Sequence, residues 1–187
     1  MQDNRQTPDL GPLAVTGATG GVGSLAIAIF AKAGYAVHAI SGKADQADWL
    51  RSLGATEVLG REALSTTRPM DTARFGGGLD NVGGPMLHAL LAHTVPYGNV
   101  ATAGLAATHD LATTVMPFII RGVSLIGVAS AGTARDLRDE VWRRLSSDWK
   151  PARLGEIATR EVGLDGLPAV FADMLAGGSR GRTVVRL

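Results

Sequence analysis

The order of apolar and polar positions along the chain predicts strands that alternate with helices. Six short apolar runs are typical of buried strands, and they lie at residues 13–15, 36–40, 57–59, 78–82, 99–102 and 123–128. Helical segments separate most of them, at about 24–32, 44–53, 85–93 and 113–121. This alternation predicts an α/β fold of the Rossmann type, a doubly wound parallel sheet of about six strands with helices on both faces.

The pattern changes after the sixth predicted strand. A helix that begins near residue 133 has apolar side chains four residues apart, as one stripe made of Leu137, Val141, Leu145 and Trp149. Pro151 marks its end, and a strand at 159–162, a helix at 167–175 and a strand at 183–185 follow. We therefore expect three parts, which are a polar lead-in at 1–12, a nucleotide-binding domain at 13–150 and a C-terminal segment at 151–187.

Composition narrows the class of protein. Apolar residues make up 45% of the 187 residues, and the net charge is +1 with dispersed Lys and Arg, so nothing indicates a nucleic-acid partner. The chain has no Cys, no apolar run near the roughly 20 residues of a membrane span, and a polar start unlike a signal peptide. We expect a cytoplasmic globular protein without a membrane partner.

A glycine-rich turn follows the first predicted strand, with the sequence Ala18-Thr19-Gly20-Gly21-Val22-Gly23. Gly20 lets the backbone approach a pyrophosphate, and Gly23 lets helix and strand pack closely. The free amides of the following helix then face the anion. No Gly-Lys-Ser/Thr follows, so the turn is not a P-loop. The cofactor-binding residues expected around this turn are Thr16, Gly20, Gly21, Val22 and Gly23.

The end of the second predicted strand indicates which dinucleotide is bound. NAD-binding proteins carry an acidic residue there, which binds the ribose 2′-hydroxyl. Here the strand ends in Ile40-Ser41-Gly42-Lys43, without a carboxylate. A hydroxyl and an ammonium attract a 2′-phosphate, and a hydrogen bond to a charged group contributes about 1.5–3 kcal/mol. We therefore predict NADP(H), held by Ser41, Gly42 and Lys43.

The glycine spacing also fits the short-chain dehydrogenases. Their proton donor is a Tyr with a Lys four residues later. The chain contains only Tyr35 and Tyr97, and the residues four positions further on are Ala39 and Ala101. We therefore reject that family.

Several motifs in order carry a different resemblance. Besides the glycine turn they are Ser41-Gly42-Lys43, Leu53-Gly54-Ala55, Leu79-Asp80-Asn81-Val82-Gly83, Ala103-Gly104-Leu105, Thr114-Val115-Met116-Pro117-Phe118-Ile119-Ile120-Arg121 and Gly181-Arg182-Thr183-Val184-Val185. With them, residues 12–187 resemble the nucleotide-binding part of zinc-free medium-chain dehydrogenases/reductases, in the acryloyl-CoA reductase and quinone oxidoreductase branch.

That resemblance implies further site residues. Ala103 and Gly104 would lie beside the nicotinamide ribose, and Phe118 and Val128 would border the nicotinamide. Glu57 stands where relatives can carry an Arg near the 2′-phosphate, and Arg61 is the expected substitute.

The resemblance also implies parts beyond the nucleotide domain. Family members have a GroES-like substrate domain of on the order of a hundred residues before it, and the segment at 151–187 would complete that absent domain. We therefore expect a fragment. The sixth strand would pair across a two-fold axis, which predicts a homodimer that light scattering can test.

The implied activity is NADPH-dependent hydride transfer to an α,β-unsaturated acyl-CoA such as acryloyl-CoA, or to a quinone or enone. The alternative is a non-catalytic NADP(H)-binding or interaction module. No residue stands out as a catalytic proton donor, and the four scattered His residues show no metal-ligand spacing, so no metal is predicted.

Overall fold

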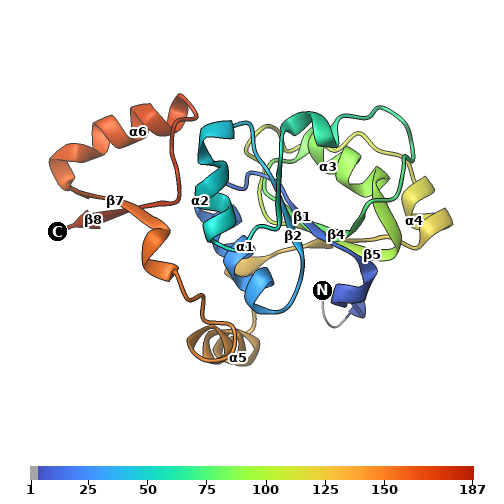
Figure 1. The fold of residues 1–187 in the computed structure, drawn as a ribbon, viewed down its shortest axis with the longest axis horizontal. Helices are drawn as coiled ribbons and strands as arrows, with labels where there is room; N and C mark the ends of the chain where they lie inside the picture. The colour runs from blue at the N-terminus through green and yellow to red at the C-terminus, as the bar shows by residue number, and fades with distance from the viewer. Residues whose placement is uncertain (1–3) are drawn as a thin grey trace.

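The computed structural model describes residues 4–187 and contains a six-stranded sheet in the order β3-β2-β1-β4-β5-β6 (Figure 1). Its strands are β1 (Leu13–Val15), β2 (Val37–Ile40), β3 (Glu57–Leu59), β4 (Phe75–Asp80), β5 (Thr94–Thr102) and β6 (Ser124–Gly127). Every neighbouring pair is parallel. The predicted doubly wound Rossmann-type class is therefore confirmed.

The helices are α1 (Gly21–Lys32), α2 (Ala47–Ser52), α3 (Gly84–Ala92), α4 (Met116–Arg121), α5 (Arg135–Ser146) and α6 (Leu167–Leu175). The first two pack on one face of the sheet and α3 on the other, as side-chain alternation in β1 requires. Leu13 and Val15 belong to the core cluster that contains Ile27 of α1 and Leu50 of α2. Ala14 belongs to the cluster that contains Leu90 of α3.

Two strands begin earlier than their sequence predicted. β4 runs from 75 to 80 instead of 78 to 82, and β5 begins at Thr94 instead of residue 99. Both early segments contain glycine, a poor strand former, and β5 also contains Pro96. The glycines are needed because a Cβ on Gly77 would lie 2.3 Å from the Asn99 carbonyl oxygen, and one on Gly78 would lie 2.4 Å from that of Ala14.

The helix predicted from residue 133 is shorter than its apolar stripe indicated. It ends at Ser146, so Trp149 lies beyond it in a turn. The Arg144 guanidinium lies 3.9 Å from the centre of the Trp149 ring, and the Trp149 amide donates to the Arg144 carbonyl oxygen at 2.8 Å. The stacking of these two side chains holds Trp149 against the end of the helix.

The segments at the two ends of the chain contact the sheet domain. Residues 1–3 of the predicted lead-in lie outside the described residues, while Gln6 is buried and donates from Nε2 to the Gly76 carbonyl oxygen at 3.1 Å. At the other end, β7 (Ala158–Gly163) and β8 (Arg182–Arg186) form a separate parallel pair, and Figure 1 shows this pair with α6 beside α2. A bridge between Gly20 and Gly181 joins the pair to the sheet domain. In residues 4–187, no helix combines the length and apolarity of a membrane span.

The core makes a direct prediction about stability. Leu90 is fully buried beneath the sheet, so Leu90→Ala should lower the free energy of unfolding by about 2–5 kcal/mol through lost burial and a cavity. The measurement is urea denaturation. Leu175→Ala is the control, because Leu175 is 89% exposed and its truncation should change stability by about 0.5 kcal/mol or less. Equal losses in both variants would contradict the assigned core.

Candidate nucleotide-binding site

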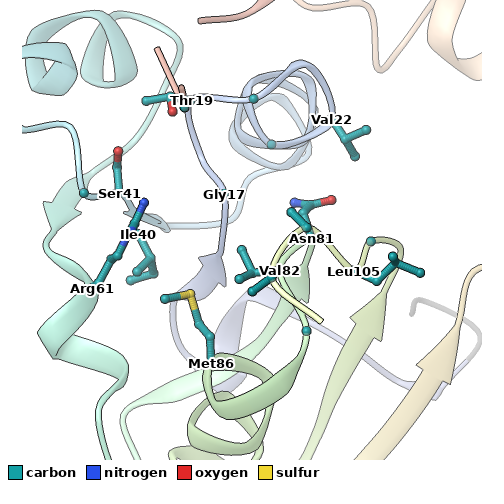
Figure 2. Close-up of a pocket in the computed structure, with 18 of the residues that line it drawn as sticks. Gly17, Thr19, Val22, Ile40, Ser41, Arg61, Asn81, Val82, Met86 and Leu105 are labelled. Carbon is teal, nitrogen blue, oxygen red and sulfur yellow. The ribbon is translucent and has the colours of Figure 1, made fainter. Parts of the chain in front are cut away.

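A groove of about 810 Å³ lies at the carboxyl ends of the central strands (Figure 2). Its walls come from the turns after β1, β2, β4 and β5. The strand order reverses between β1 and β4, and open α/β sheets bind ligands at such a reversal because the loops on either side diverge there. The topology thus places the groove where a nucleotide is expected.

The glycine turn after β1 forms the upper wall of the groove. A Cβ on Gly23 would lie 2.4 Å from the Gly17 carbonyl oxygen, so only glycine allows α1 to begin this close to β1. Gly20 precedes α1 with φ −75° and ψ 169°, and it has no side chain with which to cap the helix. No capping side chain therefore competes with an anion for the first-turn amides and the positive end of α1.

A buried hydrogen-bond network ties the ends of β1 and β4 together beneath this turn. The Thr16 hydroxyl donates to Asp80 Oδ1 at 2.7 Å and accepts from the Asn81 amide at 2.9 Å. Asp80 also accepts from the Gly83 amide at 2.8 Å, and Asn81 Nδ2 donates to the Thr16 carbonyl oxygen at 2.8 Å. Asp80 therefore organises the turn that follows β4. Asn81 lines the groove, and Figure 2 shows it between Val22 and Leu105.

Cationic side chains gather where β2 ends. Ser41, Lys43 and Arg61 all line the groove, and the Ser41 hydroxyl accepts from the Lys43 amide at 3.0 Å. Arg61 covers Gly42, since a Cβ there would lie 2.7 Å from Arg61 Nε. Glu57 does not line the groove, and it pairs instead with His38, Oε2 to Nδ1, at 3.3 Å. The charge facing the groove at this end is therefore positive.

The wall opposite the glycine turn is made of small residues after β5. Ala103 donates its amide to the Asp80 carbonyl oxygen at 2.8 Å. A Cβ on Gly104 would lie 2.5 Å from the Asn81 carbonyl oxygen, so glycine is required for the two turns to meet. Ala103, Gly104 and Leu105 all line the groove.

The C-terminal segment closes one side of the site. Gly177 and Ser179 line the groove. The Arg182 side chain covers Gly21 at the start of α1, because a Cβ on Gly21 would lie 2.6 Å from Arg182 Nε. A guanidinium thus lies beside the amides that would receive an anion.

Most of the residues predicted to bind the cofactor line this groove. The predicted residues in its lining are Gly20, Gly21, Val22, Gly23, Ser41, Gly42, Lys43, Ala103 and Gly104. Thr16 lies behind the wall, fully buried in the network with Asp80. Phe118 is partly buried and packs against the core cluster that contains α3, and Val128 follows β6 with 48% exposure. Neither lines the groove, and their contact with a nicotinamide stays a prediction.

Other lining residues were not predicted. Val82 and Met86 follow β4, and only their place at the carboxyl end of a strand could have indicated them. Gly177 and Ser179 come from a segment that was expected to serve another domain. Nothing in the sequence indicates that this segment crosses the groove.

The histidines lie away from the groove. His38 is inside β2, where burial lowers its pKa and the neighbouring Glu57 raises it to a smaller extent. His88 Nδ1 is 2.9 Å from the Thr113 hydroxyl oxygen, and His93 Nδ1 is 2.8 Å from the Thr72 carbonyl oxygen. His109 is exposed next to Asp110. These contacts give the histidines structural positions.

Fold and site together define a dinucleotide-binding domain, and comparison with known proteins places it in a family. The zinc-binding dehydrogenase family model matches residues 21–147, so the chain belongs to that family of medium-chain dehydrogenases and reductases. Within residues 4–187, no three His, Cys, Asp or Glu side chains are grouped as a metal site requires.

The chain is similar to particular members of this family. It is 41% identical over 187 residues to the acrylyl-CoA reductase AcuI of Ruegeria pomeroyi, covering 99% of this chain and 56% of that protein. It matches the crystal structure of Bacillus subtilis YhfP with NAD bound at a TM-score of 0.94 and 41% identity, covering 100% of this chain and 57% of YhfP. It matches Escherichia coli K-12 YhdH with bound NADPH at 0.93 and 39%, covering 98% and 57%. The chain thus spans slightly more than half the length of these relatives and corresponds to their nucleotide-binding part.

The buried network makes a prediction about Thr16. Thr16→Val keeps the shape of the side chain but removes the hydroxyl, so Asp80 Oδ1 loses its bond from that hydroxyl and the Asn81 amide loses its acceptor. The free energy of unfolding should fall by about 1–3 kcal/mol, measured by chemical denaturation. Thr16→Ser retains the hydroxyl and is the matched control. If the valine and serine variants are equally stable, the network does not hold the two strand ends.

Proposed function

We propose that the groove binds NADP(H), and that the chain is the cofactor-binding part of an NADPH-dependent reductase. The observation that carries the proposal is that two parts of the groove can each receive a phosphate group. Helix amides lie at the end of β1, and Ser41, Lys43 and Arg61 lie at the end of β2, where an NAD-binding domain would carry a carboxylate. YhdH is solved with NADPH, which supports NADP(H), and YhfP is solved with NAD, which supports a dinucleotide site in general.

Each part of the groove has a separate task in this proposal. The amides after Gly20 and the Arg182 guanidinium receive the diphosphate, because both present N–H donors to an anion. Ser41, Lys43 and Arg61 receive the 2′-phosphate. The small residues Ala103 and Gly104 leave room for the nicotinamide ribose beside Asn81.

The proposed reaction is reduction of an α,β-unsaturated acyl-CoA, with a quinone or enone as the other substrate class. When bound, NADPH supplies the hydride, and the protein orients the ring and keeps water away. AcuI is named an acrylyl-CoA reductase and YhfP a candidate quinone oxidoreductase, which supports both classes. We also propose that β6, at the edge of the sheet, forms a homodimer interface.

One observation favours the alternative, a non-catalytic NADP(H)-binding module. The ionisable side chains that line the groove are Lys43 and Arg61, and both lie at the 2′-phosphate end. The described residues therefore place no acid or base beside the nicotinamide end. This polypeptide by itself would then bind the cofactor without turning a substrate over.

A two-stage assay tests the function. NADPH fluorescence should change and saturate on titration with the chain, because the groove shields the nicotinamide from water. NADPH oxidation with acryloyl-CoA or a quinone then distinguishes the reductase from the module. Turnover supports the reductase, binding without turnover supports the module for this chain, and no binding at all contradicts both.

Charge reversal at the glycine turn gives a sharper test. Gly20→Asp places a carboxylate where the diphosphate would lie, so the Kd for NADPH should rise by at least about tenfold. The fold should be retained, because a Cβ on Gly20 meets only the Gly17 carbonyl oxygen, at 3.3 Å, which a shift of a few tenths of an ångström relieves, and Asp is a favoured helix N-cap.

The control for this variant is Gly163→Asp. Gly163 also precedes a helical turn in an extended conformation, with no atom within 4 Å of a Cβ, and it does not line the groove. Fluorescence titration gives the Kd and a thermal melt checks the fold. An unchanged Kd in a folded Gly20→Asp protein would show that the turn is not the phosphate site.

A further inference from the structure

A short segment that connects α6 to the first residue of β8 borders the groove on one side. We call residues 177–182 the strap. Two of its residues, Gly177 and Ser179, line the groove, and Figure 1 shows the segment descending beside α2 before it enters β8. The strap therefore belongs to the wall of the site and is more than a connection to the C-terminal strand pair.

The strap contacts the side chain proposed to recognise the 2′-phosphate. Lys43 Nζ donates to the Ser179 carbonyl oxygen, across 136 positions of sequence, and both residues are half-buried. An ammonium has three protons, so this bond leaves two for a phosphate. A carbonyl oxygen cannot neutralise the ammonium, and the positive charge remains available to an anion.

Three contacts fix the strap to the sheet domain. The Gly181 amide donates to the Thr19 carbonyl oxygen of the glycine turn at 2.8 Å. Arg180 Nη1 donates to Gln46 Oε1 at 2.8 Å, and its guanidinium lies 5.1 Å from the centre of the Trp49 ring. Gln46 and Trp49 follow Lys43 closely in the chain, and Thr19 belongs to the glycine turn. Contacts with two separate segments of the sheet domain therefore hold the strap beside the Lys43 ammonium.

We propose that the strap sets the preference for NADP(H) over NAD(H) by holding the Lys43 ammonium in place at the end of β2. The proposal rests on the proposed function. A free lysine side chain is flexible and must be ordered when it binds phosphate, whereas a side chain already held by the Ser179 carbonyl loses less freedom. Ser179 acts here as a positioning residue through its backbone, and Arg180 acts by keeping Ser179 where it is.

This role differs from a merely structural one in what it predicts. If the strap only covers the groove, or acts only through Arg182 and the diphosphate, loosening it should weaken NADPH and NADH equally, because both carry the diphosphate. If it positions Lys43, loosening it should weaken NADPH selectively, because only NADPH carries the 2′-phosphate. The loss should also disappear once Lys43 is absent.

The experiment is a double-mutant cycle on the 187-residue chain. Arg180→Ala removes the anchor on Gln46 and Trp49, Lys43→Ala removes the ammonium, and the double variant combines them. The Kd values for NADPH and for NADH are measured separately by fluorescence titration. Arg186→Ala is the matched control, because Arg186 lies in β8 and pairs with Glu161 away from the groove.

The expected pattern is selective and non-additive. Lys43→Ala should raise the Kd for NADPH about tenfold or more, and Arg180→Ala about three- to tenfold, with less than about a twofold change for NADH in either variant. In the Lys43→Ala background, Arg180→Ala should change the Kd for NADPH by less than about twofold. The control should behave as the wild type with both cofactors.

Gly181→Val is a second way to move the strap. Gly181 has φ +58°, and a Cβ there would lie 2.2 Å from the Ile157 carbonyl oxygen, so valine must displace the segment. It should reproduce the selective loss of NADPH, with a thermal melt to confirm that the sheet domain remains folded.

The outcomes separate the two proposals. Equal weakening of both cofactors by Arg180→Ala, no effect on either, or an undiminished effect without Lys43 would overturn the role of the strap while leaving the nucleotide site intact. A wild-type chain that binds neither cofactor would overturn the proposed function, and the role of the strap with it.

Discussion

The hydrogen bonds that join the ends of β1 and β4 are the constraint on which the rest of the site depends. The order of the sheet reverses between these strands, so their following turns diverge and leave space between them. That space is useful only if both turns stay in place, and the buried Thr16 and Asp80 side chains provide this through bonds to each other and to backbone amides. An unpaired polar group at this depth would be costly, so each member of the network needs its partners.

The walls of the groove follow from how closely the backbones approach each other. Gly23 and Gly104 each lie where a Cβ would overlap a carbonyl oxygen of a neighbouring turn. Because these glycines have no side chains, the backbones approach closely, and helix amides and small residues form the surface of the groove. Charge is then added at the ends, by Lys43 and Arg61 after β2 and β3 and by Arg182 from β8. Backbone geometry thus supplies the shape, and long cationic side chains supply the positive charge.

Residue patterns predicted the structure correctly where residues close together in the chain control the conformation. The alternation of apolar runs predicted the class of fold, and the run from Gly20 to Gly23 predicted the tight turn that opens α1 and lines the groove, because steric demands at such a turn admit few other residues. The bounds of β4 were less accurate, since Gly76 and Gly77 are poor strand formers in isolation. Their place between two backbones, which makes glycine necessary, depends on neighbours distant in the sequence.

The sequence by itself therefore determined the fold class, the glycine turn before α1 and the absence of a carboxylate after β2, all of which depend on residues close together in the chain. Only the tertiary structure decided that Thr16 supports the groove from behind, that Phe118 packs against the core, and that the strap reaches Lys43. These facts depend on contacts between segments up to 136 positions apart. No periodicity or motif records such contacts, because packing of the whole chain brings the segments together.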